Sequence, residues 1–298
     1  ASVTLGWGTT GWTPIGDGTT KFTGTYDGQG KIIDGISVKR TGTNYQGLFG
    51  YVEGATIGQL GVTNVRVTGG NYVGALVGLS DNASAVEENF SDGHVAGGYN
   101  IGGLVGGNIF GSSVSDCYSR CAVSADSCAG GLSGTVYQAA VTNCYSTGEV
   151  EHAPASGGLI GTAAESTIDG SFWDLQTSGQ NTSAGGTGRT TAEMKTQSIF
   201  LDSSWDGGTW NMDAGVNDGY PYLKWQNPDG TPLPVQLAAF TAVCGANSVE
   251  LRWTTVTEVN CAGYEIERRR IRDTEFGIQE SGWEKVGFVR GSGTSYSP

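Results

Sequence analysis

Side chains that could carry acid–base chemistry recur along this sequence at nearly regular intervals. They are Glu87, Glu88 and Asp116, with Asn143 and Asp169 in the adjoining slots of the series. Two carboxylates held close together on one face can have separated pKa values, so that one donates and the other accepts a proton, as in enzymes that cleave polysaccharides. Asn143 interrupts the series that runs from Asp116 to Asp169. The pattern therefore favours a solvated polar face, and we predict no catalytic residues and no enzymatic activity.

Oxygen donors also gather in one glycine-bearing loop. They are Asn211, Asp213, Asn217 and Asp218. Hard oxygen ligands at alternate positions suit calcium, but the loop lacks both the Asp-x-Asp-x-Asp-Gly order and the glutamate at the twelfth position. A turn-rich capping segment without metal is the favoured interpretation, with calcium as the alternative. We predict no other cofactor.

The six cysteines favour an oxidising compartment. Cys117 and Cys144 occupy the same slot of consecutive repeats, where a reduced ladder is favoured over a disulfide because stacked side chains rarely point correctly for a bond. The better disulfide candidates are the pair Cys121 and Cys128 and the pair Cys244 and Cys261. The spacing of the first four cysteines does not resemble the paired knuckles of a zinc site. His94 and His152 are interpreted as surface or corner residues.

A fixed repeat must position all these groups. Strings of the type Gly-Leu-x-Gly, one of them beginning with alanine, recur along the chain at a nearly constant step. Their closing glycines are Gly50, Gly78, Gly106, Gly134 and Gly161. A period of this length is typical of a solenoid, in which each repeat forms one coil.

Two further apolar columns keep the same spacing. They run Ile57, Val86, Val114, Val141, Ile168 and Val67, Val95, Val123, Val150. The three apolar runs of each repeat are short, rich in β-branched residues and separated by Gly, Ser, Asn and Asp, which predicts strands. Stacked coils place equivalent side chains about 4.8 Å apart in a dry interior. We predict an all-β fold, namely a right-handed parallel β-helix with coils of about 28 residues, followed by a partial antiparallel β-sandwich.

Four aromatic residues should stack on the outside of this β-helix. They are Phe90, Tyr118, Tyr145 and Phe172. Each tyrosine follows an inward cysteine, and alternation along a strand turns it outward. Such a ladder either binds a sugar or a protein, or is covered by another part of the chain. We favour a cover, and keep the four residues as candidates for a binding surface.

At these residues the chain resembles the GLUG repeats of bacterial surface and adhesin-type proteins. The resemblance rests on the Gly-Leu-x-Gly strings with the segments Val114–Ser119 and Val141–Ser146. The lead-in Trp12–Gly16 and the closing segments Phe172–Asp174 and Tyr220–Leu223 are also similar. It covers roughly residues 12–225. It implies a scaffold rather than a reaction.

A second module is predicted after the Pro-rich linker of residues 228–234. Residues 235–298 resemble the fibronectin type III-like domain of many secreted Bacteroidetes and Chlorobi-group proteins, often exported by type IX secretion. The similar segments are Leu233–Leu237, Trp253–Asn260 and Gly291–Ser295. A complete sandwich has about seven strands, and this one is about three short. We expect either a longer parent chain or a strand donated by a second copy, which would give a head-to-tail filament.

Composition limits the partners. The net charge of −13 disfavours nucleic acid, whose phosphates need clustered Lys and Arg. No apolar run is long enough to insert into a membrane. We therefore predict a β-helix in residues 1–227, with a capping segment at about 172–227, that acts as a non-enzymatic extracellular or cell-surface scaffold or adhesin. Its partners would be a surface glycan or protein, or a second copy. The alternatives are a filament subunit and a carbohydrate-active enzyme.

Overall fold

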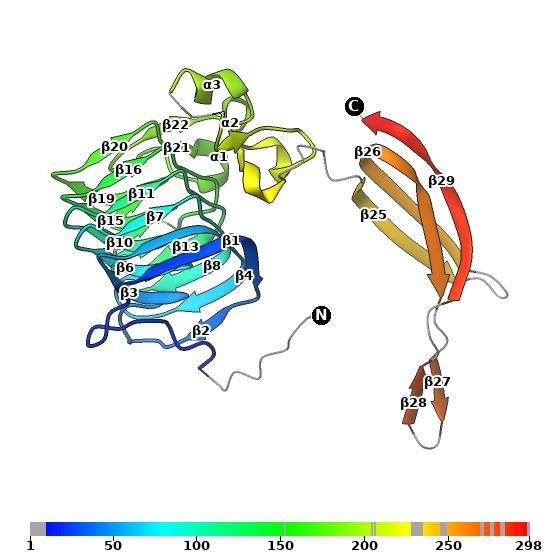
Figure 1. The fold of residues 1–298 in the computed structure, drawn as a ribbon, viewed down its shortest axis with the longest axis horizontal. Coiled ribbons are helices and arrows are strands. Elements are labelled where there is room, and N and C mark those ends of the chain that lie inside the picture. Colours follow the sequence, from blue (N-terminus) through cyan, green and yellow to red (C-terminus); the bar gives the residue numbers. More distant parts are fainter. Residues whose placement is uncertain are drawn as a thin grey trace. The chain divides into compact units, whose positions relative to one another are not determined.

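The computed structural model describes residues 10–227 except 152, 204 and 206, and the backbone of the strands within 235–296 (Figure 1). The chain divides into two compact units. The first comprises Ala1–Met212 and Pro221–Gln226, and the second Asp213–Tyr220 and Asn227–Pro298. The predicted linker at 228–234 lies outside the described residues. No helix among the described residues is long and apolar enough to cross a membrane.

The first unit is a parallel β-helix whose coils contribute to three sheets (Figure 1). The first sheet contains β3 (Phe49–Glu53), β6 (Val77–Asp81), β10 (Val105–Ile109), β15 (Ser133–Tyr137) and β19 (Ile160–Ala164). The second contains β5 (Val73–Gly74), β9 (Ile101–Gly102), β14 (Cys128–Gly130) and β18 (Ala155–Gly157). Each strand pairs with its equivalent one coil away, so the predicted parallel β-helix is confirmed.

The third sheet has 13 strands and two arms. The long strand β4 (Thr56–Thr68) pairs with strands of both arms. One arm continues through β7 (Ala85–Glu87), β11 (Ser113–Ser115), β16 (Ala140–Thr142) and β20 (Thr167–Asp169). The other continues through β8 (Phe90–Gly97), β12 (Tyr118–Ser119), β17 (Tyr145–Ser146), β21 (Phe172–Asp174) and β22 (Thr187–Arg189). The remaining strands are β1 (Thr25–Asp34), β2 (Ser37–Lys39) and β13 (Ala122–Ala125).

The three predicted apolar columns form the interior. Leu76, Leu104, Leu132 and Leu159 are fully buried, and Leu48 is nearly so. The valines and isoleucines of the other two columns are buried with them, except Ile168, which is partly buried at the end of the stack. Equivalent side chains lie over one another because the strands pair in register, for example Val86 with Val114 and Val114 with Val141.

A corner with a left-handed backbone conformation separates the two arms of the third sheet in successive coils. Its residues are Gln59, Glu88, Asp116, Asn143 and Gly170, with φ between 50° and 53°. Asn, Asp and Gly tolerate this conformation better than other residues do. The polar residues at this position are therefore explained first by the geometry of the turn.

Short elements follow the last coil. They are α1 (Leu175–Ser178), α2 (Thr191–Met194), α3 (Gln197–Leu201), β23 (Trp210–Asn211), η1 (Asn217–Gly219), β24 (Tyr222–Leu223) and η2 (Lys224–Gln226). Asp174 caps α1 by accepting hydrogen bonds from the N–H groups of Gln176 and Thr177. Thr190 and Glu193 form a capping box at α2. β23 and β24 pair antiparallel.

The strands of the second unit pair antiparallel, as predicted for this part of the chain. β25 (Val235–Cys244), β26 (Val249–Arg268) and β29 (Glu284–Tyr296) form one sheet, and β27 (Ile271–Thr274) pairs with β28 (Gly277–Glu280). The long strand β26 contains both Trp253 and Tyr264. Shifts of register near Cys261 accommodate the irregular stretch between them, as β-bulges do.

Candidate functional site

The four predicted outward aromatic residues form a stacked ladder. Phe90 pairs with Tyr118, Tyr118 with Tyr145, and Tyr145 with Phe172. The ring centroids of Phe90 and Tyr118 are 5.0 Å apart, and those of Tyr118 and Tyr145 are 4.9 Å apart, with nearly parallel planes. None of the four belongs to the interior cluster, so the predicted outward direction agrees with the structure. All four are nevertheless 5% exposed or less.

A strap covers this ladder. We use this name for Trp205 together with residues 207–212 and 221–226. Trp225 packs on Phe90 at 5.6 Å between ring centroids, and Trp210 lies 6.2 Å from Tyr118. The indole N–H of each tryptophan donates one hydrogen bond to the corner. Trp205 donates to Gly170 O at 2.6 Å, and Trp210 donates to Asp116 Oδ1 at 2.9 Å. Trp225 donates to Glu88 O at 3.0 Å. The strap is thus fastened to the left-handed corner beside the ladder.

The tyrosine hydroxyl groups of the ladder also bind the strap. Tyr145 donates to Pro221 O at 2.6 Å, and Gln226 Nε2 donates to the hydroxyl of Tyr118 at 2.8 Å. Burial raises the pKa of Tyr118. The cover favoured from the sequence is therefore present, and the four rings do not offer an exposed binding surface. The tryptophans of the strap were not predicted, although their clustering in one short polar segment was a usable signal.

The predicted column of acidic residues is out of register at its last member. Asp169 pairs with Thr142, so the residue that follows Asp116 and Asn143 at the corner is Gly170. The corner residues Asp116, Asn143 and Gly170 are 27 positions apart, whereas Asp169 follows Asn143 by only 26 positions. The Asp116 carboxylate accepts the indole N–H of Trp210, which ties it to the strap.

The two glutamates differ in their neighbours: Glu87 has no carboxylate at the equivalent position of the adjacent coils, whereas Glu88 and Asp116 occupy the same corner in successive coils. Glu87 is exposed and pairs with Ser115 and with Gly58. Glu88 accepts a hydrogen bond from Gln59 Nε2 at 3.1 Å. Both side chains of this Glu88–Asp116 pair are hydrogen-bonded within the protein, to Gln59 Nε2 and to the indole N–H of Trp210 respectively.

The predicted calcium ligands make local hydrogen bonds. Asn211 Oδ1 accepts from the N–H of Met212, and Asp213 Oδ1 accepts from the N–H of Gly215. Asn217 and Asp218 lie in η1 with left-handed backbone conformations. Among the described residues, no group of three or more His, Cys, Asp or Glu side chains could hold a metal ion.

The cysteines of the β-helix are free thiols. Cys117, Cys121, Cys128 and Cys144 are all buried, and none of them forms a disulfide. The predicted bond between Cys121 and Cys128 is therefore absent. Cys121 faces the interior cluster, whereas Cys128 lies outside that cluster and its thiol contacts the hydroxyl of Tyr99, a half-exposed side chain. The side chains of Cys244 and Cys261 lie outside the described residues, and their pairing stays a prediction.

We expect the four β-helix thiols to resist alkylation in the native protein. The thiolate is the reactive form, and burial raises the pKa of Cys121 to about 12 and that of Cys144 well above its ordinary value. Iodoacetamide at pH 8 should leave all four unlabelled in the native protein. It should label all four once the protein is denatured, with no reductant added, as measured by mass spectrometry of proteolytic peptides. A peptide pair linked through Cys121 and Cys128 would contradict the structure.

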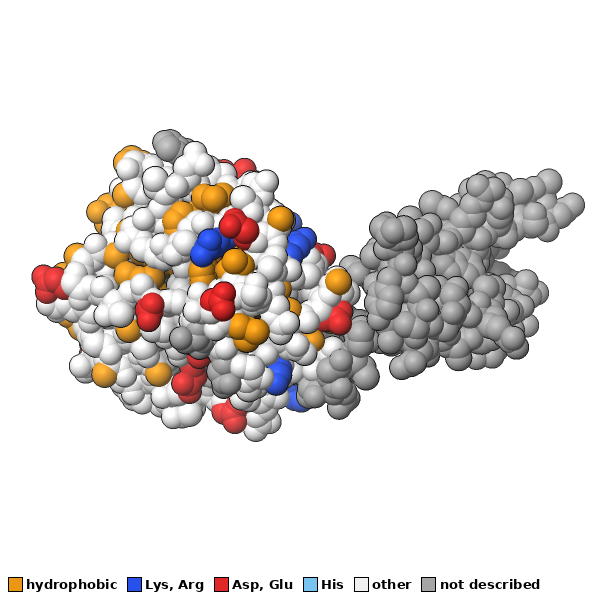
Figure 2. All heavy atoms as spheres, turned by 90° about the horizontal axis from the view of Figure 1, so that it is seen from above, with side chains coloured by type: hydrophobic (Ala, Val, Ile, Leu, Met, Phe, Trp, Pro, Cys, Tyr) orange, Lys and Arg blue, Asp and Glu red, His pale blue; other side chains and the backbone are white. Residues whose placement is uncertain are grey.

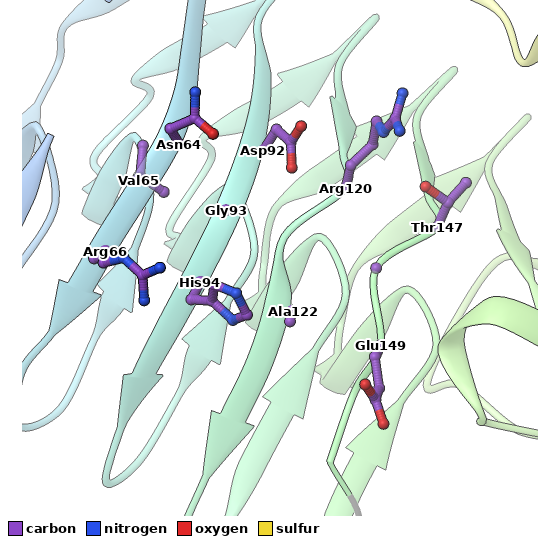
Figure 3. A pocket seen from close by; sticks show the side chains of 11 residues that line it. Asn64, Val65, Arg66, Asp92, Gly93, His94, Arg120, Ala122, Thr147 and Glu149 are labelled. Atoms are coloured by element: carbon purple, nitrogen blue, oxygen red, sulfur yellow. The ribbon is translucent and has the colours of Figure 1, made fainter. Parts of the chain in front are cut away.

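An open groove on the outer face of the third sheet gathers charged side chains from successive coils (Figure 3). Its volume is about 440 Å³. It lies where the strands are interrupted, between β12 and β13 and after β17. Its polar lining includes Asn64, Arg66, Asp92, His94, Arg120 and Glu149. We call it the polar groove.

His94 is the one predicted surface histidine that the structure describes, and it lies exposed in the polar groove. It pairs with Arg66 on one side and with Ala122 on the other. The bridge between Val123 and Val150 places Glu149 next to Ala122 in the following coil. His152 lies outside the described residues.

Comparison with known proteins supports the repeat class. Residues 125–151, about one coil, match the family model described as "The GLUG motif". Together with the three parallel sheets, this match supports a β-helix built from GLUG repeats.

Two curated proteins are similar over parts of the chain. Halomucin of Haloquadratum walsbyi is 43% identical over 72 residues, which are 24% of this chain and 1% of halomucin. A protein described as "Putative Gly-rich membrane protein" of Evansella cellulosilytica is 42% identical over 88 residues, which are 27% of this chain and 10% of that protein. The chain thus spans a small part of these relatives. No solved structure matches it significantly.

Proposed function

We propose that this chain is a non-enzymatic repeat scaffold of an extracellular or cell-surface protein. The observation that carries the proposal is that hydrogen-bond acceptors at the left-handed corner, next to the aromatic ladder, hold the strap. The Asp116 carboxylate, one of the acid–base candidates of the sequence, binds the indole of Trp210. A side chain held in this way stabilises the coil stack and is not free to approach a substrate.

Two further observations support a surface scaffold. The face of the first unit in Figure 2 is mostly uncharged and carries its acidic side chains at scattered positions. The similar proteins are a halomucin and a putative Gly-rich membrane protein, names that fit a surface location. On the resemblance of residues 235–298, we also propose that this part is a fibronectin type III-like domain of a secreted protein.

We expect no release of reducing ends when the protein is incubated with a panel of polysaccharides. If turnover is found, Asp116→Asn and Glu88→Gln are the diagnostic variants, because both keep an oxygen acceptor and remove the carboxylate. Exposed Glu87→Gln serves as the matched control. Turnover that Asp116→Asn abolishes without lowering the melting temperature would overturn the scaffold proposal.

Surface exposure is tested separately. Antibodies raised against residues 10–227 should label intact cells that produce the protein, and external protease should remove the label. Label that appears only after the cells are permeabilised would contradict an extracellular location.

A further inference from the structure

Part of the polar groove is formed by polar side chains that have no partner among the described residues. At other positions on the outer face, polar side chains of neighbouring coils pair with one another. The pairs are Lys21 with Glu53, Tyr51 with Asp81, Gln138 with Glu165, Ser124 with Glu151, and Asp34 with Thr63 and Asn64.

In the groove, the side chains of Arg66, Asp92, His94 and Glu149 make no hydrogen bond or ion pair with any described residue. Their donors and acceptors are therefore open to a ligand. Hydrogen-bond donors and acceptors lie close together here, since Arg66 is in register with His94 and Asp92 precedes His94 by two positions in β8. Figure 3 shows Arg66 on β4, Asp92 and His94 on β8, and Glu149 on a connecting segment.

The backbone is exposed at the floor of the groove because two residues there must be glycine, which has no side chain. A Cβ at Gly93 would lie 2.3 Å from Val65 O, and a Cβ at Gly148 would lie 1.9 Å from Cys121 O. With Ala122 between them, the floor has almost no side chains. A flat ring could approach the backbone here, with polar side chains at its edges.

We propose that the polar groove binds a segment of a neutral, linear glycan lying along the axis of the β-helix. A sugar hydroxyl both donates and accepts hydrogen bonds, so it matches a lining in which guanidinium and imidazole groups alternate with carboxylates. A polyanion fits less well, because Asp92 and Glu149 would repel it. From Arg66 to Glu149 the groove crosses three strand spacings, about 14 Å, which is enough for more than one sugar ring. The scaffold function does not require this site.

The test is titration of the whole chain with cellohexaose, maltohexaose, chitohexaose and, for comparison, a hexamer of galacturonate. We expect at least one neutral hexamer to bind with a Kd on the order of 1 mM or tighter, measured by calorimetry. The double variant Arg66→Gln with Glu149→Gln should weaken binding tenfold or more. Both residues are exposed, so the fold should remain unchanged, as checked by the melting temperature.

The control is Glu87→Gln, which removes an exposed carboxylate outside the groove and should leave Kd unchanged. The proposal is overturned if no neutral hexamer binds, if only the galacturonate hexamer binds, or if the double variant binds as tightly as the parent. None of these outcomes affects the scaffold proposal, which depends on the turnover and cell-surface measurements.

Discussion

Replacing Leu104 with aspartate is expected to unfold the β-helix at room temperature or to lower its melting temperature by more than 10 °C. Leu104 is fully buried between Leu76 and Leu132, which occupy the same position in the neighbouring coils. An unpaired carboxylate there costs several kcal/mol, on the order of the 5–15 kcal/mol that stabilises a typical domain. Circular dichroism during heating measures the effect.

The matched control is Leu104→Met, which keeps the volume and apolar character and should cost less than about 1.5 kcal/mol. Coils of a solenoid contact only their neighbours, so the damage should begin at this coil. Hydrogen exchange should therefore be fastest around β6, β10 and β15. A melting temperature of Leu104→Asp within two degrees of the parent would contradict the observed register.

Removing the indole of Trp210 should have the second largest effect. Trp210 is buried, packs against Tyr118 and Tyr145, and donates a hydrogen bond to Asp116. Trp→Ala substitutions at buried sites cost about 3–5 kcal/mol. We expect Trp210→Ala to loosen the strap while the interior columns remain intact, so that the free energy of unfolding falls by about 3 kcal/mol.

A spectroscopic measurement separates loss of the strap from general instability. Burial raises the pKa of Tyr118, so uncovering the ladder should lower that pKa toward its ordinary value. Absorbance at alkaline pH should then show one or more tyrosines ionising earlier in Trp210→Ala than in the parent. The control is Glu87→Gln, which changes an exposed side chain outside the ladder and the strap and should leave both stability and titration unchanged. Equal titration curves for Trp210→Ala and the parent would show that the strap does not cover the ladder.

The repeat made most of the β-helix predictable. Residues one repeat apart in the sequence become neighbours in a solenoid, so a single period specifies many long-range contacts at once. For this reason the columns of Leu104, Val114 and Val123 were placed in the interior correctly, and the outward direction of Tyr118 and Tyr145 followed from alternation.

The limits of the same argument appear at single positions. Asp169 lies one position before the corner, where it pairs with Thr142, and the corner residue of that coil is Gly170. The disulfide predicted between Cys121 and Cys128 is absent as well. Their closeness in sequence does not indicate which side of the coil wall each thiol faces.

The sequence by itself determined the period, the strand positions and the interior of this protein, because identical contacts repeated from coil to coil leave a regular pattern. Only the tertiary structure decided what happens on the outside. The strap brings Trp225 back to Phe90 from a distant part of the chain, a contact made once and therefore without any period. The polar groove likewise depends on where strands are interrupted in successive coils. Such single contacts and gaps are set by packing in three dimensions, and they decide which outer side chains are covered and which are open to a partner.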